Sequence, residues 1–156
     1  MISVRVYSIL INEQNQILVS DELISGFEIT KFCGGGLEQG EGTIDCLKRE
    51  FIEEMNLKIE VLEHFYTTDF YQSSTFNDKH QVLSIYYTVK ALEELRVPIK
   101  KTAFEFDENQ KLAIEKDGYA QSFRLIPLSE FGESNMTLPI DKIVANLVKS
   151  KTKISL

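Results

Sequence analysis

Several residue types are scarce in this sequence, and each scarcity excludes a class of protein. The 156 residues include two cysteines, Cys33 and Cys46, and two histidines. Two cysteines do not make the disulfide framework of a small secreted domain, and these spacings do not make a zinc site with the histidines. We therefore expect a reducing compartment, by default the cytoplasm.

Long apolar runs and an excess of positive charge are also missing. No apolar run approaches the ~18 residues that a membrane span requires, and the segment MISVRVYSILINEQ lacks the pattern of a secretory signal. The 24 acidic residues outnumber the 17 lysines and arginines, so the formal net charge is −7. Passive binding to nucleic acid needs a concentrated basic face. We therefore expect no membrane partner and disfavour a nucleic acid.

The size and composition of the chain are those of an ordinary globular domain. Hydrophobic residues make up 43% of the sequence and charged residues 26%. A chain of this length buries roughly 70% of its unfolded surface and needs no covalent staple. Because the sequence contains no internal repeat or linker, we expect a single domain over residues 1–156.

The hydrophobic patterning predicts several strands. They are expected at residues 2–11, 16–20, 27–33, 58–71, 81–91 and 119–126. A turn at residues 12–15 predicts that the first two strands form a hairpin. The charged segment 92–118 is expected to be a loop with a short strand.

Two amphipathic helices are predicted, over residues 44–55 and 139–150. The first has Thr43 as its expected N-cap, and Asn56 is expected to end it in the left-handed conformation. Its apolar stripe consists of Ile44, Leu47, Phe51 and Met55. The order of strands and helices predicts a mixed sheet with helices packed on its faces.

The helix over 44–55 also carries an acidic face. Glu50, Glu53 and Glu54 project from one side, because they are three and four residues apart. Such clusters are most often solvated faces, and the like charges repel. The alternative is a cradle for Mg²⁺, which prefers carboxylate oxygens and completes its shell with water and substrate phosphate. A cluster of glycines directly before the helix, over residues 34–42, favours the cradle.

The segment from Gly35 to Leu57 resembles the Nudix box, Gly-x5-Glu-x7-Arg-Glu-U-x-Glu-Glu-x-Gly-U, in which U is a bulky aliphatic residue. Phe51 stands at the first U, Asn56 replaces the last glycine, and Cys33 replaces the proline of the usual Pro-Gly-Gly lead-in. A late stretch, residues 123–131, is similar to one common in the family but lacks its tryptophan. The matching residues are Gly35, Glu41, Arg49, Glu50, Glu53, Glu54 and Leu57.

This resemblance implies an α+β Nudix fold, with a mixed β-sheet sandwiched between α-helices. It also implies an enzyme that hydrolyses a nucleoside diphosphate linked to a moiety X, using Mg²⁺ or Mn²⁺. The implied metal ligands are the carbonyl of Gly34 and the carboxylates of Glu50, Glu53 and Glu54.

The resemblance also implies catalytic roles. Glu53 is expected to accept the proton of the attacking water. Glu54 and Arg49 complete the catalytic set, and Arg49 is expected to pair with Glu41.

Further site residues are expected from outside the box. Family members often add a fourth acid from a later loop, and here Glu115 is preferred over Glu105, Glu108 and Asp117, although each fits a solvated loop acid. Arg5 could reach a phosphate or the sugar. Phe27 and Phe32 could stack on a base, although burial in the core is the more common fate of such rings.

Sequence motifs outside the box restrict the range of candidate substrates. The ADP-ribose type has a proline where this chain has Gln72, and the NADH type has a motif with tryptophan, which this chain lacks. These absences favour a small MutT-like enzyme acting on nucleoside triphosphates or related diphosphates. We expect the chain to be a monomer or a homodimer. Three alternatives stay open: an ADP-ribose or nucleotide-sugar pyrophosphatase, a non-catalytic nucleotide-sensing domain, and an RNA 5′-end pyrophosphohydrolase, against which the net charge argues.

Overall fold

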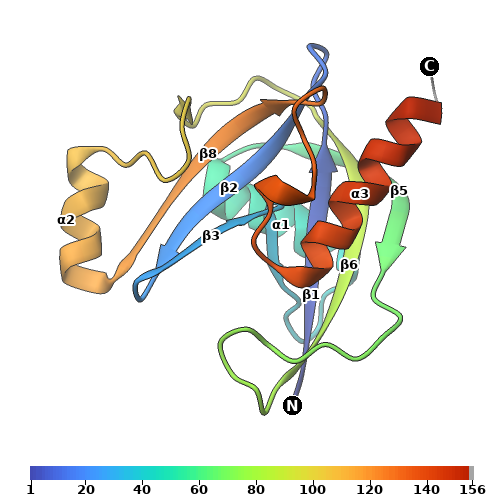
Figure 1. Ribbon diagram of the computed structural model, residues 1–156, viewed down its shortest axis with the longest axis horizontal. Helices are drawn as coiled ribbons and strands as arrows, with labels where there is room; N and C mark the ends of the chain where they lie inside the picture. Colours follow the sequence, from blue (N-terminus) through green and yellow to red (C-terminus); the bar gives the residue numbers. More distant parts are fainter. Residues whose placement is uncertain (155–156) are drawn as a thin grey trace. The chain divides into compact units, whose positions relative to one another are not determined.

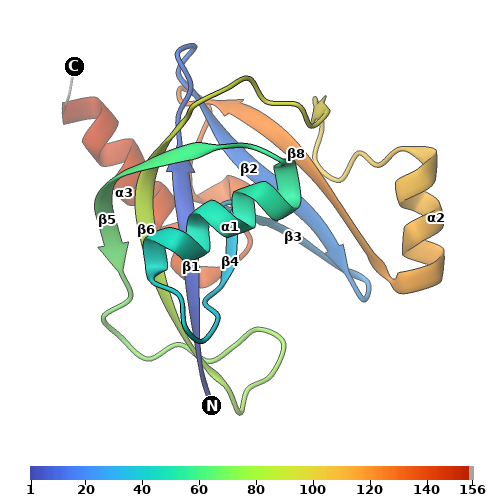
Figure 2. The ribbon, with the colours of Figure 1, turned by 180° about the vertical axis from the view of Figure 1, so that it is seen from behind.

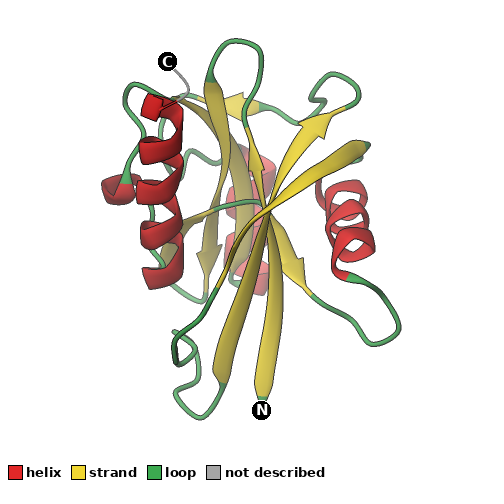
Figure 3. Cartoon of the chain, turned by 90° about the vertical axis from the view of Figure 1, so that its right-hand side faces the viewer, coloured by secondary structure: helices red, strands yellow, loops and turns green. Residues whose placement is uncertain are grey.

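The computed structural model describes the backbone of residues 1–154 and the side chains of residues 1–151. The chain divides into two compact units, the first formed by residues 1–12 and 33–96 and the second by residues 13–32 and the chain from 97 onward. Each unit contains a four-stranded mixed sheet (Figures 1 and 3). The α+β class predicted from the sequence is therefore confirmed, whereas the single domain over 1–156 stays a prediction.

The first unit combines a sheet of order β4-β1-β6-β5 with helix α1. β1 pairs in parallel with β6 and antiparallel with β4, and β5 pairs antiparallel with β6. α1 contacts β4, β1 and β5 and lies along this sheet (Figure 2). The bounds are β1 Ile2–Leu10, β4 Gly34–Gly36, α1 Thr43–Met55, β5 Ile59–Thr67 and β6 Gln81–Ala91.

The second unit has a sheet of order β3-β2-β8-β7. Helix α2 contacts β8, and helix α3 contacts the short 3₁₀ helix η1. Phe32 and Phe131 belong to this unit, and both are buried. The bounds are β2 Gln16–Ile24, β3 Phe27–Lys31, β7 Ile99–Lys100, α2 Glu108–Asp117, β8 Tyr119–Pro127, η1 Glu133–Asn135 and α3 Pro139–Ile154.

The predicted hairpin of the first two strands is wrong. β1 pairs with β6 along its whole length, from Ile2 opposite Gln81 to Leu10 opposite Val89, and β2 belongs to the other sheet. The tight hairpin is the next one, β2–β3, closed by Ser25 and Gly26 with positive φ of 48° and 85°. The turn residues at 12–15 indicate a reversal of the chain, but a strand's partner depends on burial contacts from distant segments.

Segment 92–118, predicted as a loop with a short strand, contains helix α2 as well as β7. α2 has no buried residue within its bounds, so the apolar stripe by which a helix is recognised is missing. Its ends nevertheless carry a signal: Asp107 and Gln110 form a capping box, and Gly118 ends the helix at φ 69°. The Gln110 amide also donates to the carbonyl of Gln121 on β8, at 2.7 Å.

Helix α1 begins at Thr43, so the predicted N-cap is wrong by one residue. Gly42 is the N-cap and supplies no side-chain hydrogen bond, whereas the Thr43 hydroxyl lies 2.7 Å from the hydroxyl of Tyr87. Ile44, predicted in the apolar stripe, is 44% exposed, and Cys46 is buried in its place. The prediction for the C-terminal end is confirmed, because Asn56 is left-handed at φ 48°, ψ 43°.

Two exclusions made from the sequence can be compared with the structure. Cys33 and Cys46 are both free thiols and both buried. Across residues 1–154, the helices all lack the combination of length and apolarity that crossing a membrane demands.

Substitution of Asn56 tests the left-handed end of α1. Asn56→Ala should lower the free energy of unfolding by about 1 kcal/mol. The left-handed conformation costs a residue with a Cβ roughly 1–2 kcal/mol, and alanine lacks the short polar side chain by which asparagine offsets part of that cost. Asn56→Gly should leave it unchanged or raise it slightly. Urea unfolding of the three proteins measures the difference, and an Asn56→Ala variant as stable as the wild type would contradict the assignment.

Candidate active site

All residues of the box lie in the first unit, on β4, on α1, on the loop between them and on the two residues that follow α1. Gly34 has φ +155°, and a Cβ built there would lie 2.0 Å from the carbonyl oxygen of Val6 on β1. Because backbone cannot move aside as a side chain can, only glycine fits at this position. The close approach keeps β4 against β1.

Gly35 is required for a different reason. A Cβ built on it would lie 2.3 Å from the carboxylate carbon of Glu50. The carboxylate therefore occupies the space beside the β4 backbone that a side chain at position 35 would fill. The Glu50 side chain is only 14% exposed there.

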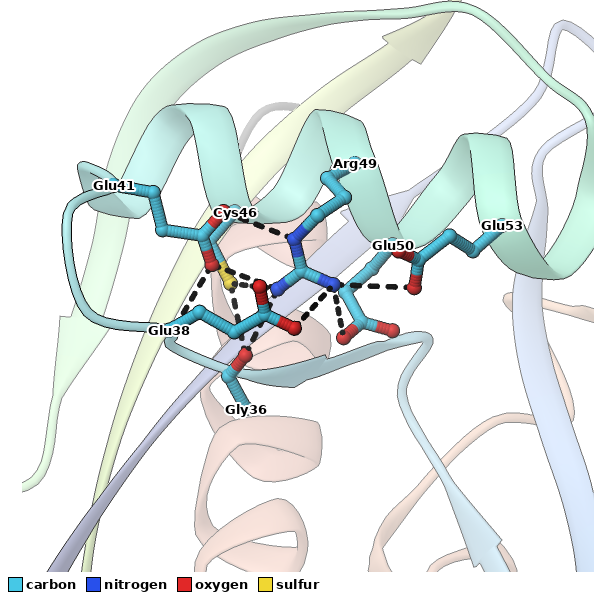
Figure 4. Close-up of polar contacts among 7 residues, drawn as sticks. All are labelled: Gly36, Glu38, Glu41, Cys46, Arg49, Glu50 and Glu53. Carbon is cyan, nitrogen blue, oxygen red and sulfur yellow. Dashed lines mark hydrogen bonds and ion pairs between the residues drawn. The ribbon is translucent and has the colours of Figure 1, made fainter.

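Arg49 forms a bidentate ion pair with Glu41, as predicted from the sequence. Its Nε donates to one carboxylate oxygen at 2.9 Å, and its Nη2 donates to the other at 2.7 Å. Nη2 also donates to the carbonyl of Gly36 at 3.0 Å. Arg49 thus joins α1 to the loop and to the end of β4 (Figure 4).

The remaining guanidinium nitrogen of Arg49 faces two of the predicted metal ligands. Nη1 donates to Glu50 at 3.1 Å and to Glu53 at 3.1 Å, and lies 3.6 Å from Glu38 (Figure 4). The Glu53 side chain is 57% exposed, in contrast to the shielded Glu50. Glu38 was not among the predicted site residues, although it lies three residues before Glu41 in a short loop and so places a second acid near Arg49.

This network shifts the pKa values of its members. Hydrogen bonds from Arg49 and from the backbone of Glu38 lower the pKa of Glu41 to about 2. Burial is the main cause that raises the pKa of the Cys46 thiol to about 12, and the nearby Glu41 is the second. A thiol with so high a pKa is protonated at neutral pH and is therefore a poor nucleophile.

The residues present fit a divalent metal ion, although they are not gathered around one. Within residues 1–151, no three acidic, histidine or cysteine side chains converge as a metal site. Glu50 and Glu53 are instead both held by one cation, Arg49 Nη1. Carboxylate oxygens are the hard donors that Mg²⁺ and Mn²⁺ prefer. Glu50 and Glu53 supply two such groups, which already bind one positive group beside a strand of glycines.

Two other predicted site residues, Glu54 and Arg5, also belong to the first unit. Glu54 is half-buried on α1. Arg5 lies on β1 opposite Gly36, where its Nη1 would be 3.2 Å from a Cβ on that glycine. Because Gly35 and Gly36 are successive strand residues, Glu50 and Arg5 lie on opposite faces of β4. The Nε of Arg5 donates to the Tyr7 hydroxyl at 3.2 Å.

The other predicted residues belong to the second unit. Glu115 is exposed on α2, and Phe27 is 61% exposed at the start of β3. Phe32 has no exposed surface, and its ring packs edge to face on Phe131 with 6.0 Å between centroids. Contributions of these three residues to the site stay predictions.

The family of the chain follows from a match over nearly its whole length. The family model described as NUDIX domain matches residues 1–147, which include parts of both units. The chain therefore belongs to the Nudix family, as the box predicts. No curated protein matches the sequence significantly.

Solved structures show the same fold at low sequence identity. The Escherichia coli ORF135 protein is 16% identical with a TM-score of 0.64, covering 93% of this chain and 86% of that one. A MutT protein from Methanosarcina mazei is 14% identical with a TM-score of 0.64, covering 97% and 96%. An ADP-ribose pyrophosphatase from Streptococcus suis is 16% identical with a TM-score of 0.53, covering 92% and 84%. Family and fold together make the chain a Nudix hydrolase, the enzyme class that the sequence predicts.

The Glu41–Arg49 pair predicts how stability depends on pH. Because the pKa of Glu41 is lowered on folding, its contribution is complete above the ordinary value of 4.5 and is lost as the pH falls toward about 2. The wild type should therefore be more stable than Glu41→Gln by a constant margin at neutral pH, and this margin should shrink between about pH 4.5 and 2. Urea unfolding across this range measures it.

The matched control is Glu13→Gln, which changes an exposed turn residue that forms no ion pair in the described part of the chain. Its stability should differ little from the wild type at any pH. A Glu41→Gln margin that stayed constant down to pH 2 would contradict the lowered pKa.

Proposed function

We propose that this chain hydrolyses a phosphoric anhydride bond in a nucleoside diphosphate derivative, with Mg²⁺ or Mn²⁺ as cofactor. The observation that carries this proposal is the pairing of Glu50 and Glu53 on one cation, 3.1 Å from each, beside the glycines of β4. A structural ion pair on a helix surface needs one carboxylate per cation. Here the acids exceed the positive charge that holds them, which suits the binding of a further cation.

The residues take distinct roles in this proposal. Glu50, Glu53, Glu54 and the Gly34 carbonyl would hold the metal, which when bound neutralises charge on phosphate oxygens and lowers the pKa of a bound water. Glu53 would accept a proton from the attacking water, and its 57% exposed side chain is open to solvent. Arg49 and Glu41 hold α1 against the loop, and Glu115 is our candidate for a fourth acid.

The proposed substrate is a small nucleotide, either a nucleoside triphosphate or a related diphosphate. The MutT protein of Methanosarcina mazei has the same fold over 97% of this chain. The net charge of −7 opposes the approach of an unshielded polyphosphate. Divalent cations therefore have to mediate its binding.

A second candidate function is the hydrolysis of ADP-ribose or of a nucleotide sugar. It is favoured by the names of two similar structures, the Streptococcus suis ADP-ribose pyrophosphatase and a UDP-X diphosphatase with 14% identity and a TM-score of 0.59. The chain spans 64% of the length of the UDP-X diphosphatase. A non-catalytic sensor is less well supported, because all three carboxylates of the box are retained.

A panel of nucleotides tests the proposal. Nucleoside triphosphates, ADP-ribose and UDP-glucose would be incubated with the protein and Mg²⁺ or Mn²⁺ at alkaline pH, and the products separated by chromatography. We expect a nucleoside triphosphate to be cleaved faster than the other compounds, and EDTA to abolish both cleavage and tight substrate binding.

Glu53→Gln is the catalytic control for this panel. It should lower kcat by roughly 10²–10⁴-fold, the contribution typical of a general base, without unfolding the protein, because Glu53 is exposed. Unchanged activity would contradict the role of Glu53. Faster cleavage of ADP-ribose would favour the second candidate, and an intact panel would favour a sensor.

A substitution on β4 tests the geometry of Glu50. Gly35→Ala would place a methyl group 2.3 Å from the Glu50 carboxylate, which must then move. The carboxylate is the end of a flexible side chain, so we expect a loss of at least about tenfold in kcat with a change in unfolding free energy below about 1 kcal/mol. Both quantities would be measured on the same preparation.

Gly42→Ala is the matched control, because a Cβ there would meet Asp45 Oδ2 at an ordinary 3.8 Å. It should keep most of the activity. Full activity in Gly35→Ala would show that the position of Glu50 against β4 does not matter.

A further inference from the structure

The guanidinium of Arg49 has two functionally different sides. Nε and Nη2 bind Glu41 and the Gly36 carbonyl, groups that hold the loop and β4. Nη1 binds Glu50 and Glu53, which belong to the proposed metal site. Nε and Nη2 therefore anchor Arg49, whereas Nη1 binds the carboxylates that a metal ion would need as ligands.

We propose that Arg49 is a resident counterion of the metal site, and that a divalent cation binds Glu50 and Glu53 by displacing Nη1 from both carboxylates. Nε and Nη2 stay on Glu41 throughout. This inference rests on the metal dependence of the proposed function. It assigns Arg49 a competing role toward the metal in addition to its structural role.

The electrostatics of α1 explain why a counterion is needed. Glu50, Glu53 and Glu54 share one face, and like charges three and four residues apart destabilise a helix. Arg49 is the positive group that meets two of them. In the described residues, the two carboxylates meet at Nη1 and do not converge with a third acid.

The structure also indicates which groups would move. Glu50 is shielded and lies against Gly35, so its carboxylate is already in place. Glu53 is largely exposed and can rotate in solvent. The guanidinium is a rigid planar group, so the bidentate pair with Glu41 fixes Nη1 as well. The exchange therefore requires the two carboxylates to turn away from Nη1, and the exposed Glu53 has the greater freedom to do so.

Arg49 could either compete with the metal for its ligands or position those ligands, and the two roles predict opposite changes in metal affinity when Arg49 is removed. A residue that only positions the ligands would weaken metal binding when it is lost. A competing counterion would instead strengthen metal binding when it is lost, because the cation no longer has to break two charge-assisted hydrogen bonds.

The experiment is a calorimetric titration with Mn²⁺ in the absence of nucleotide. Arg49→Gln should bind Mn²⁺ with a Kd lower than that of the wild type by at least about tenfold, which corresponds to the loss of one of the two charge-assisted hydrogen bonds. Arg49→Lys, which keeps the charge without the fork that reaches Glu41 and both metal-site carboxylates, should fall between them. Circular dichroism would check that each variant is folded.

Lys48→Gln is the matched control. Lys48 is exposed on the same helix and makes no ion pair within the described residues, so this variant loses the same unit of charge without the contacts. Its Kd should change by less than about twofold. A Kd in Arg49→Gln equal to or higher than that of the wild type, or no binding by any of the proteins, would overturn the proposal.

The wild type offers a test that does not depend on a folded variant. In ¹⁵N NMR of the arginine side chains, saturating Mg²⁺ should shift the Arg49 Nη1 signal and speed its hydrogen exchange, while Nε stays protected by Glu41. An Nη1 signal unaffected by saturating Mg²⁺ would overturn the proposal.

Failure of this inference can be told apart from failure of the proposed function. If the wild type cleaves nucleotides with Mg²⁺ but Arg49→Gln does not bind Mn²⁺ more tightly, the counterion role is wrong and the hydrolase stands. If the Mn²⁺ affinities follow the expected order but no nucleotide is cleaved, the hydrolase function is wrong and the counterion role stands.

Discussion

The bidentate ion pair between Arg49 and Glu41 is the interaction on which the candidate site depends. It joins residues eight positions apart and connects the glycine-rich loop to α1. Glu41 also accepts a hydrogen bond from the backbone of Glu38, and Arg49 also binds the carbonyl of Gly36. Strand, loop and helix are therefore held by one pair of side chains. The adjacent Glu50 and Glu53 can share a helix face because the same guanidinium partly neutralises them.

The limited space beside β4 is the second constraint on the site, and a different group limits the space at each of two successive glycines. At position 34 a side chain would meet the backbone of β1, whereas at position 35 it would meet the Glu50 carboxylate. The first glycine therefore keeps the strands together, and the second leaves room for a charged group. An acid held in such a confined place is less able to rotate away than an exposed one. Glu50 and Glu53 thus differ in freedom although both contact Arg49 Nη1.

Some acidic residues of the chain are neutralised by nearby basic residues. In the second unit Asp21 is fully buried and binds Arg124 at 2.5 and 2.9 Å, and buried Glu22 pairs with Lys31 at 3.1 Å. Asp21 and Glu22 are thus matched with bases, since an unpaired buried charge is costly. On α1 the carboxylates outnumber the arginine that meets them. This local excess, more than the net charge of −7, is what suits the site to a divalent cation.

The sequence by itself determined the family, the helix α1 and its left-handed end at Asn56, because the box spacing and the capping residue act within a few turns of chain. It also indicated the Arg49–Glu41 pair. Only the tertiary structure decided that β1 joins β6 rather than β2, because strand pairing depends on segments about 80 residues apart. It also revealed α2, which lacks an apolar stripe, and it placed the ring of Phe32 in the core. The division of Arg49 between the Glu41 anchor and the carboxylates of Glu50 and Glu53 is likewise tertiary, because the direction of each guanidinium nitrogen depends on where β4, the loop and α1 meet.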